Sequence, residues 1–126
     1  MQNLCAGVVI GVIILQTMVF APTIFTTIDQ APAGKLLRAL FPKFFRLLML
    51  LGIGTLVALW FDEDASPAQY VMAGLTVTLA LICAALVPAT NRATDEGAKG
   101  RFKALHTISV VLTLIILGSN IAIPFL

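Results

Sequence analysis

The chain has 126 residues, of which 60% are hydrophobic and 11% are charged, and its formal net charge is +2. A soluble domain carries roughly 25% charged residues, so this composition cannot cover a soluble surface. The mean hydropathy of +1.03 and the long uninterrupted apolar runs are typical of membrane-spanning helices. So small a net charge gives no reason to expect a nucleic-acid partner.

The first apolar segment runs from residue 4 to about residue 28 and carries no charge before Asp29. About 20 helical residues cross the hydrocarbon core of a bilayer, so we expect a spanning helix over residues 4–28. Gly7 and Gly11 form a GxxxG pattern, which permits the close approach of a second helix. That helix could belong to the same bundle or to another chain.

Two residues of this first segment depart from a regular apolar helix. Gln16 lies near its middle, where lipid offers no hydrogen-bond partner, so we expect its amide to face another helix. Pro22 lies six residues further on and is expected to kink the helix, because proline cannot donate a main-chain hydrogen bond.

The connection at residues 29–46 alternates basic and apolar side chains at helical spacing. This pattern predicts a short amphipathic helix that lies at the level of the lipid headgroups. Pro42 is expected to reset the chain direction or to open the next helix. The basic residues of this connection are Lys35, Arg38, Lys43 and Arg46.

Three further spans are predicted, over residues 44–61, 67–89 and 102–125. Ser66 as N-cap and Pro67 as the first helical residue predict where the third span begins. The three acidic residues just before it are expected to form a solvated hairpin tip, with cation binding as the alternative.

Within the third span, Gly74 is expected to keep one side small for close helix packing. Pro88 is expected to mark a kink or a stop near the membrane boundary.

All eight Lys and Arg residues lie in the connections 29–46 and 91–103, which four spans place on one side of the membrane. The turn Asp62–Ser66 and both termini fall on the other side. The positive-inside rule then predicts cytoplasmic basic connections, with the termini outside, in a bacterial inner membrane. We therefore expect a single all-α domain, an integral membrane four-helix up-down bundle with an interfacial amphipathic helix between its first two spans.

Two blocks of residues carry a resemblance to a known family. One joins the third and fourth spans: Pro88, Asn91, Asp95, Phe102, Leu105, His106 and Ser109. The other joins the first two: Pro22, Phe41 and Pro42. With both blocks in this order, the chain resembles the uncharacterised four-helix membrane family that includes the eukaryotic transmembrane proteins linked to platinum-drug resistance. This resemblance implies the four-helix fold and leaves the function open.

The chain departs from that family in two places, since its 92–101 connection is short and Thr113 stands where such chains often have Asn. It also has a more distant similarity to anthrone-oxygenase-like membrane proteins, which carry an Asn on helix three and a His early in helix four. The W-x-x-W-N-H pattern of that group is missing.

The candidate site is a polar cluster at the basic ends of the third and fourth spans. Its members are Asn91, Asp95, His106 and Ser109, with Arg46 nearby. A short connection is expected to bring Asp95 close to His106, and such a pair would orient the imidazole as in a proton relay or a ligand site. The alternative is a structural clasp that satisfies the helix ends and fixes the register of the bundle.

The sequence offers no evident catalytic machinery, and its cysteines and single histidine have no metal-ligand spacing. We therefore expect no metal and no cofactor. The favoured function is non-enzymatic association within the lipid bilayer, as a homo-oligomer or as an accessory subunit of a membrane complex. One alternative is a transporter or channel for a small solute, ion or proton, and another is an oxygenase-like membrane enzyme. A transport path would be lined by Gln16, His106, Ser109 and Asn120.

Overall fold

The computed structural model describes residues 1–126 and contains helices and turns but no strand. Its elements are α1 (Gln2–Ile14), the π-helical segment η1 (Leu15–Phe20), α2 (Ala21–Thr27), α3 (Gln30–Trp60), α4 (Pro67–Asp95), α5 (Lys99–Ala122) and the 3-10 turn η2 (Ile123–Phe125). Four helical stretches are long and apolar enough to cross a membrane: Gln2–Thr27, Gln30–Trp60, Pro67–Asp95 and Lys99–Phe125. The predicted all-α four-helix fold is confirmed.

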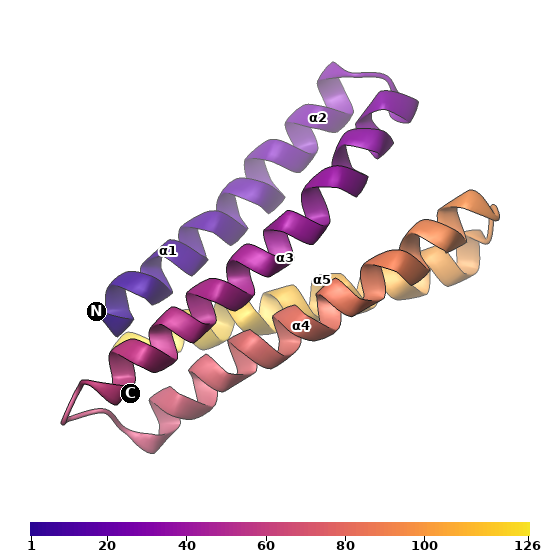
Figure 1. The fold of residues 1–126 in the computed structure, drawn as a ribbon. Coiled ribbons are helices and arrows are strands. Elements are labelled where there is room, and N and C mark those ends of the chain that lie inside the picture. The colour runs from indigo at the N-terminus through magenta and orange to yellow at the C-terminus, as the bar shows by residue number, and fades with distance from the viewer.

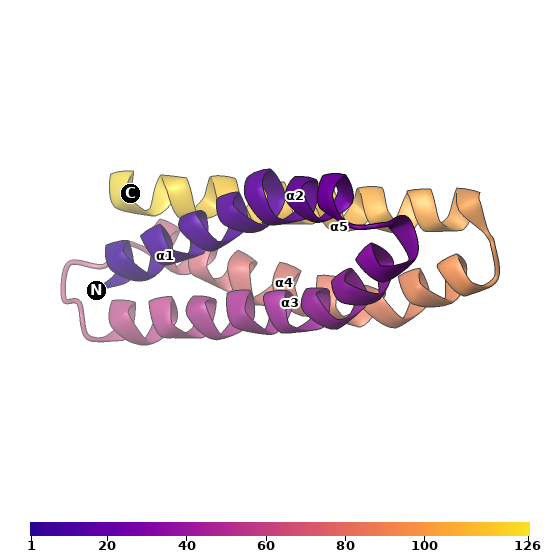
Figure 2. The same ribbon diagram turned by 90° about the horizontal axis from the view of Figure 1, so that it is seen from above.

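The helices form a closed ring in which each contacts its neighbours in the chain and α1 also contacts α5. Figure 1 shows both termini and the α3–α4 turn at one end of the bundle, which is termed the terminal face. The α2–α3 and α4–α5 connections lie at the other end, termed the basic face. Towards the basic face α2 diverges from α4 and α5, as Figure 1 shows, and it contacts neither of them. Seen from above, α2 overlies α5 without touching it (Figure 2).

The predicted interfacial helix is helical, but it is not a separate element. Helix α3 runs unbroken through 31 residues with Pro42 inside it. A proline inside a helix removes its own main-chain donor and crowds the carbonyl four residues earlier, and a helix held by its neighbours tolerates both effects. At 1.5 Å per residue α3 is about 46 Å long, so its first turns extend beyond the hydrocarbon core of about 30 Å.

Helix α4 also continues through a proline, and it ends six residues later than predicted from Pro88. It stops where Gly97 adopts a left-handed conformation with φ of 66°. There the Ala98 N–H donates to the Ala93 carbonyl at 2.9 Å and the Gly97 N–H to the Thr94 carbonyl at 3.2 Å. This is a Schellman motif, in which glycine avoids the strain that a Cβ would add. Asn91 and Asp95 therefore lie on a helix and not in a loop.

In the first span, the irregularity expected at Pro22 takes the form of the π-helical segment η1. The Ala21 N–H donates to the carbonyl of Gln16, five residues earlier, and the chain stays helical from Gln2 to Thr27. A π-helical turn shifts the hydrogen-bond ladder just before the proline that cannot join it.

The terminal face is held by hydrogen bonds from the start of α4. Ser66 and Gln69 form a reciprocal capping box, which confirms the predicted helix start. The Gln69 amide also donates to the carbonyl of Ile123 at 3.1 Å, and the Tyr70 hydroxyl donates to the carbonyl of Leu59 at 2.8 Å. These bonds tie α4 to the ends of α5 and α3.

The apolar core lies between all four spans and consists of Val9, Ile13, Phe44, Phe45, Leu48, Ala80, Cys83 and Ile116. Close helix approach occurs beside it at Gly52, where an added Cβ would lie 2.9 Å from Cγ2 of Val77. By contrast, Gly7, Gly11 and Gly74 have no atom within 4 Å of an added Cβ. The bundle therefore does not use Gly7 and Gly11 for close packing, which was one of the two alternatives for them, and the close packing expected at Gly74 is absent too. Gly52 has that role.

Candidate functional site

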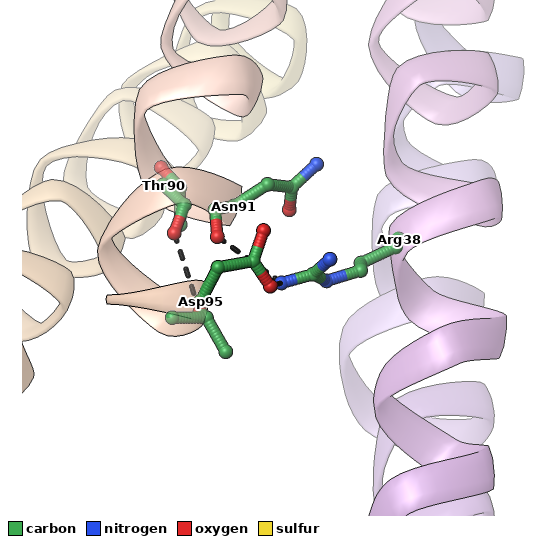
Figure 3. A network of polar contacts seen from close by, with 5 residues as sticks. Arg38, Thr90, Asn91 and Asp95 are labelled. Carbon is green, nitrogen blue, oxygen red and sulfur yellow. Dashed lines mark hydrogen bonds and ion pairs between the residues drawn. The ribbon is translucent and has the colours of Figure 1, made fainter. Parts of the chain in front are cut away.

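Arg38 links α3 to α4 at the basic face, as Figure 3 shows. Its Nη2 donates to Oδ1 of Asp95 at 2.5 Å and to the main-chain carbonyl of Asn91 at 3.1 Å. These three residues are termed the Arg38 clasp. The side chains of Arg38 and Asp95 are 38% and 62% exposed, so water screens the pair and its contribution to stability is about 0–1 kcal/mol.

Short-range contacts order the helix ends beside the Arg38 clasp. The Thr94 hydroxyl donates to the carbonyl of Thr90 at 3.2 Å, one turn earlier on α4. Across the three-residue connection, Arg101 of α5 pairs with Glu96. The ends of α4 and α5 are thus joined by an ion pair as well as by the Schellman motif.

His106 does not join this cluster. It is exposed on α5, where its ring stacks on Phe102 with centroids 5.7 Å apart and 7° between the planes. The expected pair between Asp95 and His106 is absent, because the carboxylate of Asp95 faces the guanidinium of Arg38. A charge-assisted bond to a neighbouring helix is available to Asp95 once α4 continues past Pro88.

Two other residues of the predicted cluster also make no polar contact with the Arg38 clasp. The main-chain carbonyl of Ser109 accepts a hydrogen bond from the Thr113 hydroxyl at 2.7 Å and lies 3.9 Å from Sγ of Cys83. Arg46 is exposed and forms no ion pair. The structure therefore joins Asp95 and the main-chain carbonyl of Asn91 through Arg38, while the side-chain amide of Asn91 makes no hydrogen bond. His106, Ser109 and Arg46 lie separate from them.

Polar side chains inside the spans form a second set of contacts. The amide of Asn120 donates to Oγ1 of Thr76 at 2.8 Å, which joins α5 to α4 at a fully buried point. Gln16 is only 4% exposed, as expected for a residue facing other helices, yet its Nε2 makes no hydrogen bond. No three His, Cys, Asp or Glu side chains come together in a group that could hold a metal ion.

Two open hollows lie at opposite ends of the bundle. The one at the basic face has a volume of about 580 Å³ and is lined by Gln30, Ala31, Gly34, Lys35, Arg38 and Thr94. The one at the terminal face, of about 560 Å³, is lined by residues that include Gln2, Cys5 and Asp62.

Arg38 is the site residue that the sequence does not single out. It is one of eight basic residues in the two connections that predict the topology. The signal that could have identified it is the helical spacing of residues 30–46, which continues through Pro42 without a break. A continuous helix places Arg38 beyond the membrane boundary, level with the end of the next antiparallel span.

Comparison with curated proteins finds no match, and comparison with solved structures finds none either. The family of the domain of unknown function DUF4149 matches residues 4–99. The matched segment covers the first three spans and the whole Arg38 clasp, whereas His106 and Ser109 lie beyond it. Because the match extends over well more than half of the sequence, the chain belongs to the DUF4149 family.

Proposed function

We propose that this chain is a non-enzymatic, multi-pass membrane protein that acts by lateral association, as a homo-oligomer or as a subunit of a larger membrane complex. The observation that carries the proposal is the outward position of Gly7 and Gly11 on α1. Both are exposed, and no atom lies within 4 Å of a Cβ added at either. Glycines at this spacing allow close contact with a second helix, and the chain itself supplies none.

A second small face lies on α4, at Gly74 and Thr78. Gly74 has open space around an added Cβ, and Thr78 is exposed. The hydroxyls of Thr76 and Thr113 donate to carbonyls one turn earlier, at 3.2 Å and 2.7 Å, whereas that of Thr78 makes no hydrogen bond. Lipid tails offer a hydroxyl no acceptor, so a partner helix would stabilise this position.

The two faces lie at similar depth. Gly11 is nine residues from the start of α1 and Thr78 is eleven residues from the start of α4, and both helices begin at the terminal face. At 1.5 Å per residue, their depths are about 14 Å and about 17 Å. Because α1 and α4 do not contact each other, the faces belong to different sides of the ring and could engage two neighbours.

The proposal includes an orientation, with the basic face in the cytoplasm of a bacterial cell. It rests on the positive-inside rule, since all eight Lys and Arg belong to the basic connections and none to the terminal face. Kinship with the family linked to platinum-drug resistance, and more distantly with anthrone-oxygenase-like proteins, is likewise part of the proposal. It is supported by the motif residues alone.

The alternative of transport gains no specific support from the positions of its candidate residues. Gln16 and Asn120 are buried, whereas His106 is exposed on the outer surface of α5. These side chains do not line one path within a single chain, so transport would itself require an assembly. No observation favours the oxygenase-like alternative.

Native mass measurement of the protein in lipid nanodiscs tests the proposal. We expect the mass of protein embedded in each wild-type nanodisc to exceed that of one 13.4 kDa chain. Gly11→Leu should shift the protein mass towards that of a single chain, because the added side chain prevents close helix approach. Its Cβ has no atom of another helix of the same chain within 4 Å, so the substitution leaves the packing at that point undisturbed.

Gly118→Leu is the matched control, since Gly118 is also exposed with open space around it but has no second glycine one turn away. Its particle mass should equal that of the wild type. A wild-type particle of one chain, with no second protein present, would contradict the proposal.

A further inference from the structure

The hollow at the basic face has the composition of an anion site. Its volume of about 580 Å³ opens between the first turns of α3 and the last turn of α4. Two of its six lining residues, Lys35 and Arg38, are cationic, and none is acidic. The Gln30 side-chain amide adds a neutral donor.

The charges near the hollow leave Lys35 without a partner. Asp95 already pairs with Arg38, whereas Lys35 is exposed and forms no ion pair. Asp29, just before α3, is the nearest other carboxylate in the chain order. Residues 29–46 and 91–103 together carry eight cations against three carboxylates, those of Asp29, Asp95 and Glu96. The surrounding field therefore attracts anions.

The depth of the hollow matches the headgroup layer of a bilayer. If the hydrocarbon core begins at Trp60, where α3 ends, about 20 residues place its other boundary near Phe41. Arg38 and Lys35 then lie about 5 Å and about 9 Å beyond that boundary. Lipid phosphates occupy the layer just outside the hydrocarbon core.

We propose that this hollow binds a phosphate-bearing anion at the membrane surface, with Lys35 as its main cationic contact and Arg38, held by Asp95, as the second. Both an anionic lipid headgroup and free phosphate carry this chemistry. Basic hollows beside membrane helices recognise anionic headgroups in this way. The inference is independent of the proposed lateral association, since none of its residues belongs to the Gly7–Gly11 or Gly74–Thr78 faces.

Native mass spectrometry of the delipidated protein in a neutral detergent, titrated with phosphatidylglycerol or phosphatidylcholine, tests this site. We expect phosphatidylglycerol to bind saturably at one site per chain. Phosphatidylcholine should bind there with at least fivefold lower affinity. Lys35→Gln should weaken phosphatidylglycerol binding about fivefold, the effect of one lysine at an anionic surface. Lys103→Gln, an exposed lysine of the same face outside the hollow, is the control and should bind as the wild type does.

A second pair of variants tests the hollow without changing charge. Gly34→Leu places a side chain where no atom lies within 4 Å of the added Cβ, so it fills the hollow and favours the helix. It should abolish the preference for phosphatidylglycerol while leaving the thermal unfolding temperature at or above that of the wild type. Gly100→Leu, near the start of another helix at the basic face and with no atom within 4 Å of an added Cβ, should keep the preference.

Competition with millimolar inorganic phosphate distinguishes the two sources of the anion. Displacement of phosphatidylglycerol by phosphate would show that the hollow binds the phosphate group itself. Retention of the lipid would show that the whole headgroup is the ligand. The proposal would be overturned if both lipids bound equally and phosphate did not bind. It would also be overturned if Lys35→Gln and Lys103→Gln lost the same affinity for phosphatidylglycerol.

Discussion

Replacement of Leu48 by alanine is expected to lower the free energy of unfolding by about 2 kcal/mol. Leu48 is 0% exposed and packs in the core against residues such as Ile13 and Ile116. Truncation leaves a cavity whose lining loses its van der Waals contacts. The loss should fall at the low end of the range for such substitutions, because helices separated in lipid remain in an apolar medium.

Leu50→Ala is the matched control for this experiment, because the same atoms are removed two residues along the same helix. Leu50 is 60% exposed on the outer surface of α3, so its replacement should change the unfolding free energy by less than about 0.5 kcal/mol. Unfolding by detergent titration in mixed micelles provides the measurement. Equal losses for the two variants would contradict the assignment of the α3 faces.

The second large effect is expected at Gly52, where even alanine should destabilise the fold by about 1–2 kcal/mol. Its added Cβ would lie 2.9 Å from Cγ2 of Val77 and 3.2 Å from the main-chain nitrogen of the same residue. Relief requires α3 and α4 to move apart, because main-chain atoms cannot rotate away. This cost exceeds the gain in helix propensity from glycine to alanine, which is at most about 1 kcal/mol.

Gly54→Ala, in the same helix, separates the cost of the close contact from the gain in helix propensity. A Cβ at Gly54 meets only Sγ of Cys5, at 3.9 Å, which is an ordinary van der Waals contact. The variant should therefore be as stable as the wild type or slightly more stable in the same detergent titration. A Gly52→Ala protein that unfolds no earlier than Gly54→Ala would show that α3 and α4 do not approach closely at this point.

The parts of the fold that depend on local sequence could be predicted. Spanning helices follow from the length of the apolar runs. The start of α4 follows from Ser66 and Pro67, because the residues that cap a helix lie within three positions of its first residue. The helix boundaries predicted at Pro42 and Pro88 were wrong, because α3 and α4 continue through these residues. Whether a proline ends a helix depends on the neighbours that hold the remaining hydrogen bonds, and those neighbours are distant in sequence.

The candidate site was predictable only in part, for the same reason. Asn91 and Asp95 were expected near the end of the third span, because both follow Pro88 closely in the chain. That they lie one turn apart on a helix was not expected, because the span was predicted to end at residue 89. The partner of Asp95 is 57 residues away in the chain, and the sequence offered His106 as a nearer candidate. The outward direction of Gly7 and Gly11 likewise depends on how α1 rotates against α3 and α5, which the GxxxG pattern does not determine.

Photo-crosslinking in intact membranes tests lateral association most directly. A photo-reactive benzoylphenylalanine at Val8 lies next to the glycine face of α1, and one at Val71 lies one turn from Gly74 on α4; both valines are exposed. The control position is Leu114, which is 57% exposed on α5. We expect protein adducts, identified by mass spectrometry as a second copy or one reproducible membrane partner, from position 8 or 71 and none from position 114. Adducts with lipid alone at both test positions would contradict association through these faces.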